Sequence, residues 1–149
     1  MAAAAAPISL IVSETAAIAP GIHRFELREP GGGELPAFTP GAHIDVEVPS
    51  GGVRKYSLCN DPDERDRYVI AVKREDEGRG GSASLIDGVA AGARLACAFP
   101  RNDFPLAERA TNFLFIAGGI GITPILSMVR HLKSTGRARF RLYYCTRGP

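Results

Sequence analysis

The sequence predicts a small antiparallel β-barrel followed by the opening strand, helix and strand of a parallel α/β layer. Two observations lead to this fold class. From Ile8 to Pro100, short strand-like pieces alternate with turn signals, and no long helical pattern interrupts them. After "FPRNDFPL" the hydrophobic pattern changes: an apolar run is followed by residues with helical spacing and then by a second apolar run.

Six candidate strands make up the barrel part. "HIDVEV" alternates most clearly, with Ile44, Val46 and Val48 on one face and Asp45 and Glu47 on the other, as a half-buried strand requires. Turn-rich stretches such as "EPGGGELP" and "NDPDERD" separate the pieces. A small closed barrel with Greek-key connections is favoured by these short predicted strands, at 8–14, 21–28, 43–48, 54–59, 67–74 and 93–99.

Two helices are predicted. In "GRGGSASLIDGV" glycines lead to Ser82 as the expected N-cap of a short helix that ends at Gly88. Later, "TNFLFIAGG" is expected to be a buried strand, "ITPILSMVRHLKSTG" a helix and "FRLYYCT" a second strand. The expected division is a disordered tail at 1–7, a barrel domain at 8–107, and the N-terminal part of a truncated α/β domain at 108–149.

The composition argues against several classes of protein. The 149 residues, 45% of them hydrophobic, can bury a core, and the formal net charge of +2 is scattered, so nucleic acid is a poor partner. Cys59, Cys97 and Cys145 lie far apart and the histidines lack ligand spacing, so we expect no metal site, no disulfide framework and a cytoplasmic location. Glycines and Pro124 interrupt "FLFIAGGIGITPILSMV", and we therefore expect no transmembrane span.

Two glycine-rich turns stand at the predicted helix starts. In "AGGIGITP", Gly118, Gly119 and Gly121 permit close approach of a ligand, and Pro124 costs no helical hydrogen bond. Backbone N–H groups and the positive end of the helix dipole would converge there on a diphosphate. "GGS" at 80–82 offers a second nest, suited to a phosphate monoester. A purely structural turn would explain either stretch alone.

The stretch "VRKYSLCNDP" places an arginine, a tyrosine and a serine at the end of a predicted strand. Tyr56 could stack on a flat ring, Ser57 could hydrogen-bond a ring heteroatom, and Arg54 could neutralise a phosphate. Lys73, on the strand "YVIAVKRE", could supply a second cation for the same phosphate. The alternative is a barrel strand with a core tyrosine and solvated surface cations.

The blocks "RKYSLCNDP", "YVIAVKRE", "GRGGSASLID", "PRNDFPL" and "AGGIGITPILSM", in this order, closely resemble the phthalate dioxygenase reductase and vanillate demethylase reductase family. The resemblance covers nearly the whole chain and implies a ferredoxin reductase-like flavoprotein. It implies that FMN takes hydride from NADH and passes electrons, through a two-iron two-sulfur domain, to an aromatic-ring oxygenase. The C-x4-C-x2-C cluster ligands are absent here, so we expect that domain to be missing.

The same resemblance implies roles for individual residues. Ser57 and Thr123 are the expected catalytic residues, Ser57 near the flavin N5 atom and Thr123 between the nicotinamide and the flavin. The phosphate end of FMN is expected at Arg54, Lys73, Gly81 and Ser82. The expected cofactor-binding set is Arg54, Tyr56, Ser57, Ala71, Val72, Lys73, Gly80, Gly81, Ser82, Gly118, Gly119, Gly121, Thr123 and Pro124.

Two other interpretations stay open at this point. The chain could be a non-catalytic flavin-binding fragment whose nucleotide half is too incomplete to work, or an FAD-dependent relative. NADPH in place of NADH also stays open, because the residues that would read a ribose 2′-phosphate would lie mostly after "YYCTRGP". The oxygenase partner and its aromatic substrate cannot be read from these residues.

Overall fold

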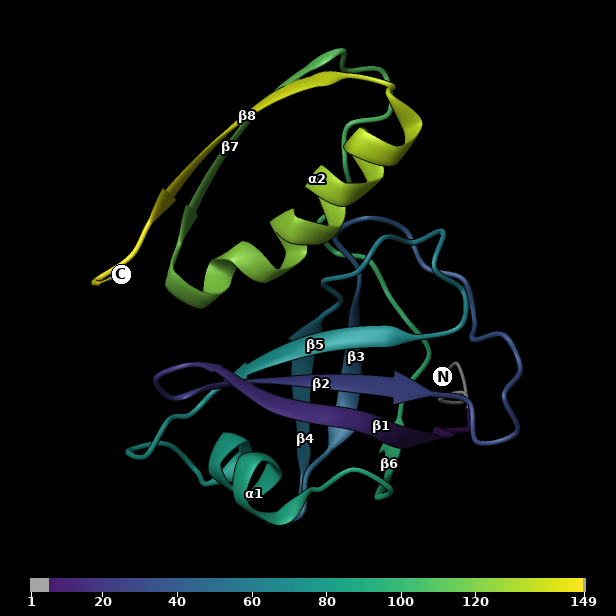
Figure 1. Ribbon diagram of the computed structural model, residues 1–149, viewed down its shortest axis with the longest axis vertical. Helices are drawn as coiled ribbons and strands as arrows, with labels where there is room; N and C mark the ends of the chain where they lie inside the picture. The colour runs from purple at the N-terminus through teal and green to yellow at the C-terminus, as the bar shows by residue number, and fades with distance from the viewer. Residues whose placement is uncertain (1–5, 149) are drawn as a thin grey trace, which may run out of the picture.

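The computed structural model describes residues 6–148 and divides into a β-barrel and a smaller α/β part (Figure 1). Five residues of the predicted tail at 1–7 lie outside the described range. The elements, in chain order, are β1 (Ile8–Ala19), β2 (Ile22–Arg28), β3 (His43–Glu47), β4 (Val53–Ser57), β5 (Tyr68–Lys73), α1 (Gly81–Gly88), β6 (Arg94–Cys97), β7 (Asn112–Gly118), the short 3-10 helix η1 (Gly119–Gly121), α2 (Ile122–Thr135) and β8 (Arg139–Cys145).

The barrel is one six-stranded sheet with the order β4-β3-β6-β1-β2-β5, and its paired strands run antiparallel. Neighbours that are distant in the chain, such as β3 and β6, give the Greek-key connectivity that the strand pattern predicts. The edge strands β4 and β5 come into contact, which curls the sheet into a barrel. The predicted fold class is therefore confirmed, and each predicted strand is found within a few residues, although β1 continues to Ala19.

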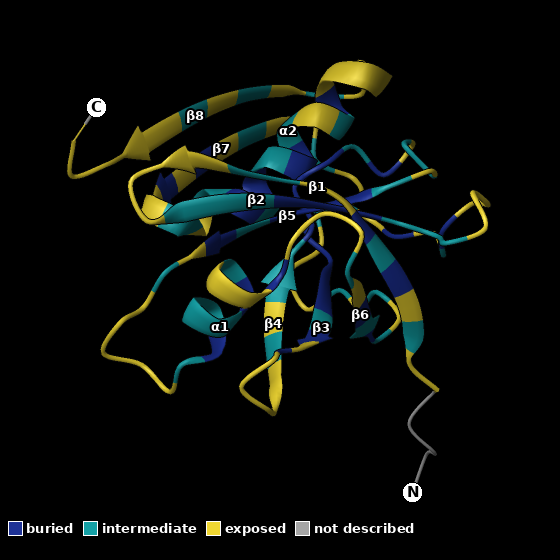
Figure 2. Ribbon diagram, turned by 60° about the horizontal axis from the view of Figure 1, so that its bottom comes forward, coloured by how far each residue is buried: buried dark blue, intermediate teal, exposed yellow. Residues whose placement is uncertain are grey.

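Alternating inward residues fill the barrel. Phe25 and Leu27 on β2, and Ile70 and Val72 on β5, are completely buried, and Figure 2 shows dark blue inside the sheet. Each such side chain contributes about 1.5–3 kcal/mol when it leaves water. Tyr68 is also buried, and its hydroxyl donates to the carbonyl oxygen of Pro36. The polar end of this core ring is thereby satisfied.

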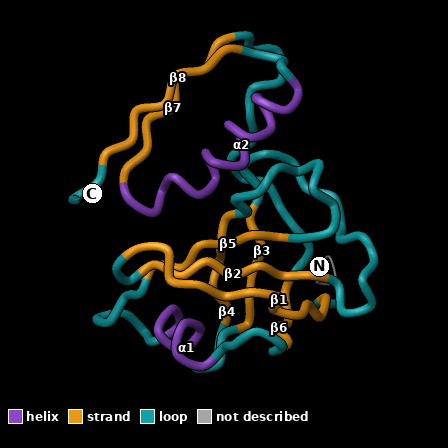
Figure 3. The backbone as a smooth tube through the Cα atoms, viewed as in Figure 1, coloured by secondary structure: helices purple, strands orange, loops and turns teal. Residues whose placement is uncertain are grey.

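In the α/β part, β7 and β8 pair in parallel and α2 packs along one side of them (Figure 3). This confirms the predicted order of strand, helix and strand. The second core joins Phe115 and Ala117 of β7 to Ile125, Met128 and Leu132 of α2. The strand predicted to be buried, β7, is buried on one side only.

One face of β7 is open, because α2 covers only the other. Leu114 and Ile116 are 62% and 70% exposed, while their neighbours Phe115 and Ala117 are buried. A strand alternates sides, so a helix on one face buries every second residue. Among the described residues, no helix has the length and hydropathy needed to cross a membrane.

The two parts meet where α2 lies over the barrel. A Cβ on Gly41 would collide with the carbonyl oxygen of Phe104 and would lie 2.7 Å from Cε of Met128 on α2. Gly41 also has a φ of 96°, which side chains rarely adopt. This glycine therefore permits both the turn before β3 and the close approach of α2.

Candidate functional site

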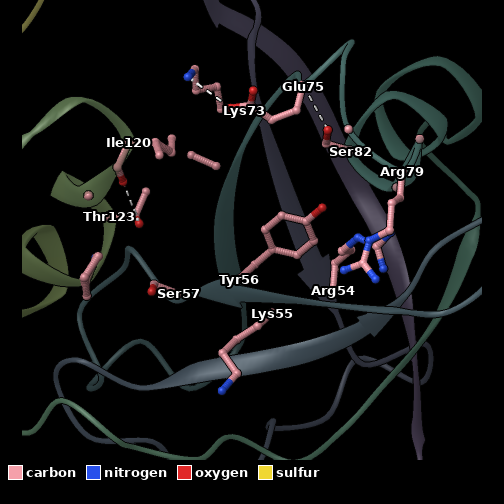
Figure 4. A pocket seen from close by; sticks show the side chains of 16 residues that line it. Arg54, Lys55, Tyr56, Ser57, Lys73, Glu75, Arg79, Ser82, Ile120 and Thr123 are labelled. Carbon is pink, nitrogen blue, oxygen red and sulfur yellow. Dashed lines mark hydrogen bonds and ion pairs between the residues drawn. The ribbon is translucent and has the colours of Figure 1, made fainter.

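A cavity of about 550 Å³ opens where β4 meets β5 (Figure 4). Its walls come from β4, β5, the loop at 75–80, the start of α1, and the turn that leads from β7 into α2. The edge strands β4 and β5 touch but do not pair through backbone hydrogen bonds. Their backbone groups and side chains are therefore free to line a crevice. The site therefore lies at the seam of the barrel, beside the α/β part.

One end of the cavity is cationic. The side chain of Arg54 crosses directly over Gly81, where an added Cβ would lie 2.5 Å from Arg54 Nε. Figure 4 places the guanidinium of Arg79 next to that of Arg54. The first turn of α1 begins at Gly81, behind them, and its free N–H groups add positive potential. This end is built to hold an anion.

The predicted N-cap role of Ser82 is wrong. Helix α1 begins one residue earlier, with Gly80 at the cap in the left-handed conformation (φ 79°) and no side-chain cap bond. Ser82 Oγ instead accepts a hydrogen bond from the backbone N–H of Glu75, at 3.0 Å. Glycine can adopt this φ without strain, so the turn closes before the serine. The Ser82 hydroxyl stabilises the loop at 75–80, and the residue still lines the cavity.

Tyr56 occupies the middle of the cavity, between Arg54 and Ser57 along β4 (Figure 4). Its ring is half-buried and packs against the barrel core. Burial raises the pKa of its phenol, although the nearby Arg54 works in the opposite direction. The tyrosine is therefore neutral at physiological pH and offers a flat ring for stacking.

The opposite end carries hydroxyl groups and a tight turn. Ser57 lies there with Ile120, Gly121, Thr123 and Pro124. Thr123 is buried, and its Oγ1 donates to the carbonyl oxygen of Ile120 at 3.0 Å, which fixes the turn between η1 and α2. The end of β4 and the glycine turn, far apart in the chain, thus open into one cavity.

Several expected site residues lie elsewhere. Gly118 and Gly119 precede the part of the turn that lines the cavity. Val72 is completely buried in the barrel core, whereas Ala71 and Lys73 face the cavity, because side chains alternate along a strand. Only the backbone of Val72 is therefore available to a ligand at this seam.

Lys73 forms an ion pair with an acidic neighbour at the cavity. Its Nζ lies 3.0 Å from Glu75 Oε1, and Figure 4 shows this pair away from the two arginines. That Lys73 and Arg54 share one phosphate stays a prediction, since both side chains line the same cavity. Residue spacing missed Arg79, whose direction depends on the path of a loop; its signal is an arginine directly before "GGS".

The arrangement suits one elongated ligand, with an anionic tail at the arginines, a flat ring at Tyr56 and a polar reactive edge at Ser57. A glycine turn beside that edge leaves room for a second planar group. Within residues 6–148, the acidic, cysteine and histidine side chains form no group of three that could hold a metal ion.

The comparisons with known proteins agree on one group of reductases. No family model matches the chain. It is 62% identical to the phthalate 4,5-dioxygenase oxygenase reductase subunit of Pseudomonas putida over 132 residues, which are 89% of this chain and 41% of that protein. It is 54% identical to the vanillate O-demethylase oxidoreductase of Pseudomonas putida over 115 residues, 77% of this chain and 36% of that protein.

A solved structure gives the same result. It is a phthalate dioxygenase reductase, described as a modular structure for electron transfer from pyridine nucleotides to [2Fe-2S]. It matches with a TM-score of 0.95 and 52% identity, over 96% of this chain and 44% of that one. The chain spans about two fifths of the length of the curated relatives it matches.

Proposed function

Because the chain belongs to the phthalate dioxygenase reductase and vanillate demethylase reductase family, we propose that it binds FMN and receives NADH in an oxygenase reductase. One observation carries the proposal. A single cavity joins the two arginines and the start of α1 to Tyr56, Ser57 and the turn before α2. An oxidoreductase that moves hydride between two flat rings needs both rings in one crevice.

The residues present fit FMN. Arg54, Arg79 and the first turn of α1 would hold its phosphate, and glycine at 81 leaves the space that the arginine side chain occupies. Tyr56 would stack against the ring system, and Ser57 would hydrogen-bond its reactive edge. When bound, FMN accepts hydride and passes electrons on singly. A pair of guanidiniums at a helix start suits a terminal dianionic phosphate, which favours FMN over FAD.

Gly121, Thr123 and Pro124 would receive the nicotinamide end of NADH. The Thr123 hydroxyl already donates a hydrogen bond to the carbonyl oxygen of Ile120 and so fixes the turn. The fixed turn would orient the entering ring. The protein thereby contributes orientation and water exclusion to the transfer. In domain terms, we assign flavin binding to residues 8–107 and the start of the NAD-binding domain to 108–149.

The relatives named above are reductase components of oxygenases, and one is described as transferring electrons to [2Fe-2S]. We propose that the same holds for this protein and that its electrons pass through a two-iron two-sulfur centre to an aromatic-ring oxygenase. The three free cysteines at 59, 97 and 145 support a reducing, cytoplasmic location.

An absorption spectrum of the purified protein, recorded before and after anaerobic NADH, tests the proposal. We expect a flavin spectrum that NADH bleaches, and acid release of FMN identified by chromatography. A flavin spectrum unchanged by NADH would leave only a binding fragment. Released FAD would overturn the assignment of FMN.

A further inference from the structure

We propose that Tyr144 is a positioning residue that holds the glycine turn, residues 118–121, in the shape that receives the nicotinamide nucleotide. The inference rests on the proposed function and extends it to a residue of β8 that lies outside the cavity lining. Its basis is a hydrogen bond between two segments that are 25 residues apart in the chain.

The hydroxyl of Tyr144 donates a hydrogen bond to the backbone carbonyl oxygen of Gly119, at 3.1 Å. The strand register explains why the ring reaches the turn. Tyr144 lies opposite Ala117 in the parallel pair of β7 and β8, and Ala117 packs into the core with α2. Partners in the register of neighbouring strands project from the same face of a sheet. The ring of Tyr144 therefore lies on the α2 side, beside the end of β7, where the turn begins.

Little packing holds the glycine turn itself. A Cβ added to Gly118, Gly119 or Gly121 would meet no atom from another part of the chain within 4 Å. Gly119 also has a φ of 51°, in the left-handed region that glycine enters and leaves readily. Hydrogen bonds must therefore fix the shape of the turn.

Two carbonyl groups of the turn each accept a hydrogen bond from a hydroxyl. The carbonyl of Gly119 accepts from Tyr144 and also from the backbone N–H of Ile122. The carbonyl of Ile120 accepts from Oγ1 of Thr123. Thr123 and Ile122 belong to the helix that follows the turn directly, whereas Tyr144 connects the turn to a separate strand. Its hydroxyl therefore fixes the turn relative to the sheet.

The direction of the Gly119 carbonyl decides where the next N–H points. In a planar trans peptide the C=O and N–H groups point in opposite directions. With the Gly119 carbonyl held toward Tyr144, the N–H of Ile120 points away from that hydroxyl, and Ile120 lines the cavity. The first N–H groups of a helix have no partner within it, so they remain available to an anionic group of the nucleotide.

NMR of the turn glycines in the flavin-free protein tests this role directly. We would label glycine with ¹⁵N and compare wild type with Tyr144→Phe, which removes only the hydroxyl. We expect new exchange broadening, on the microsecond to millisecond timescale, at the amides of Gly118, Gly119 and Gly121. Turn amides that stay as sharp in Tyr144→Phe as in wild type would overturn the proposal.

Tyr143→Phe is the matched control. Tyr143 lies opposite Ile116, on the open face of the sheet, and is 56% exposed. Its ring therefore projects from the face opposite to Tyr144, and the loss of its hydroxyl should leave the glycine amides unchanged. Equal broadening in both variants would show that the end of β8 has loosened as a whole, and this result would also overturn the role assigned to Tyr144.

Flavin reduction by NADH in FMN-loaded protein gives a second readout. We expect Tyr144→Phe to raise the NADH concentration that gives half the maximal rate about threefold to tenfold, because a smaller fraction of molecules has the turn in its receptive shape. The maximal rate and the affinity for FMN should stay within about twofold of wild type, since the change leaves the competent state intact. An unchanged half-saturating concentration, or a loss of FMN affinity, would overturn the proposal. If NADH does not reduce the wild-type flavin, the proposed function fails, whereas the glycine amides still decide whether Tyr144 orders the turn.

Discussion

The guanidinium of Arg130 on α2 donates a hydrogen bond to the backbone carbonyl oxygen of Cys59, two residues after the end of β4. The backbone N–H of Cys59 donates to the carbonyl oxygen of Val69 on β5, at 2.8 Å. Cys59 therefore ties the α/β part to both strands at the seam. This contact holds α2 against the end of β4, close to Ser57.

Replacing Arg130 with Gln should weaken this junction. We expect the free energy of unfolding to fall by about 1 kcal/mol, because a charged donor to a carbonyl is lost from a partly exposed site. Urea denaturation measures it. Arg137→Gln is the control, since Arg137 donates to the carbonyl of Glu108 within the α/β part, at 3.0 Å. The junction has no special weight if Arg137→Gln lowers the free energy of unfolding as much as Arg130→Gln does.

Gly81→Ala should loosen the phosphate end without unfolding the protein. The new methyl group would lie 2.5 Å from Arg54 Nε and push the guanidinium aside. We expect FMN affinity to fall about tenfold, as for one lost charged hydrogen bond. Fluorescence titration measures it. Gly88→Ala, at the other end of α1, meets only Pro49 at 3.8 Å and should bind FMN normally.

Arg79 and Lys73 should contribute unequally to FMN binding. We expect Arg79→Gln to weaken FMN about tenfold, while Lys73→Gln, which only removes the partner of Glu75, should have a smaller effect. Riboflavin lacks the phosphate and serves as the control ligand, so Arg79→Gln should leave its affinity unchanged. Equal losses for both ligands would place Arg79 at the ring instead.

Glu26 should make stability depend on pH in the acid range. Burial acts to raise the pKa of its carboxyl, but hydrogen bonds from Arg67, Arg28 and Ser13 outweigh it and bring the pKa from 4.5 to about 2. The folded pKa is below the unfolded one, so this stability, at most about 3 kcal/mol, is complete above pH 4.5 and disappears as pH falls toward 2.

Glu26→Gln should remove this dependence, and urea unfolding at pH 7 and pH 3 measures it. The control is Glu14→Gln, because Glu14 is 57% exposed where it pairs with Arg24 and should change stability by less than about 1 kcal/mol. An unfolding free energy of Glu26→Gln that drops between the two pH values as steeply as wild type would contradict the assignment.

The local pattern of residues was enough to predict most elements and part of the site. The alternation in "HIDVEV" predicts β3, the helical spacing after "AGGIG" predicts α2, and Arg54, Tyr56 and Ser57 follow from one strand motif. These features depend on neighbours within a few residues, which the sequence displays directly. The cavity does bring that motif together with Gly121 and Thr123.

Other features depend on contacts between distant segments. The cap of α1 at Gly80 instead of Ser82, the pairing of Lys73 with Glu75 and the direction of Arg79 follow from the path of one loop. The exposure of Ile116 follows from a helix on only one face of β7. Periodicity shows which residues share a face of an element, but it does not show what covers that face.

By itself, then, the sequence determined the succession of strands and helices, the fold class, and the grouping of Arg54, Tyr56 and Ser57 on β4, because each is encoded in short-range spacing. Only the tertiary structure decided that His43 stands opposite Ser57, that Arg79 lies beside Arg54, and that Arg130 reaches Cys59. Strand register and loop path arise when the whole chain buries its core, and no local run of residues contains them.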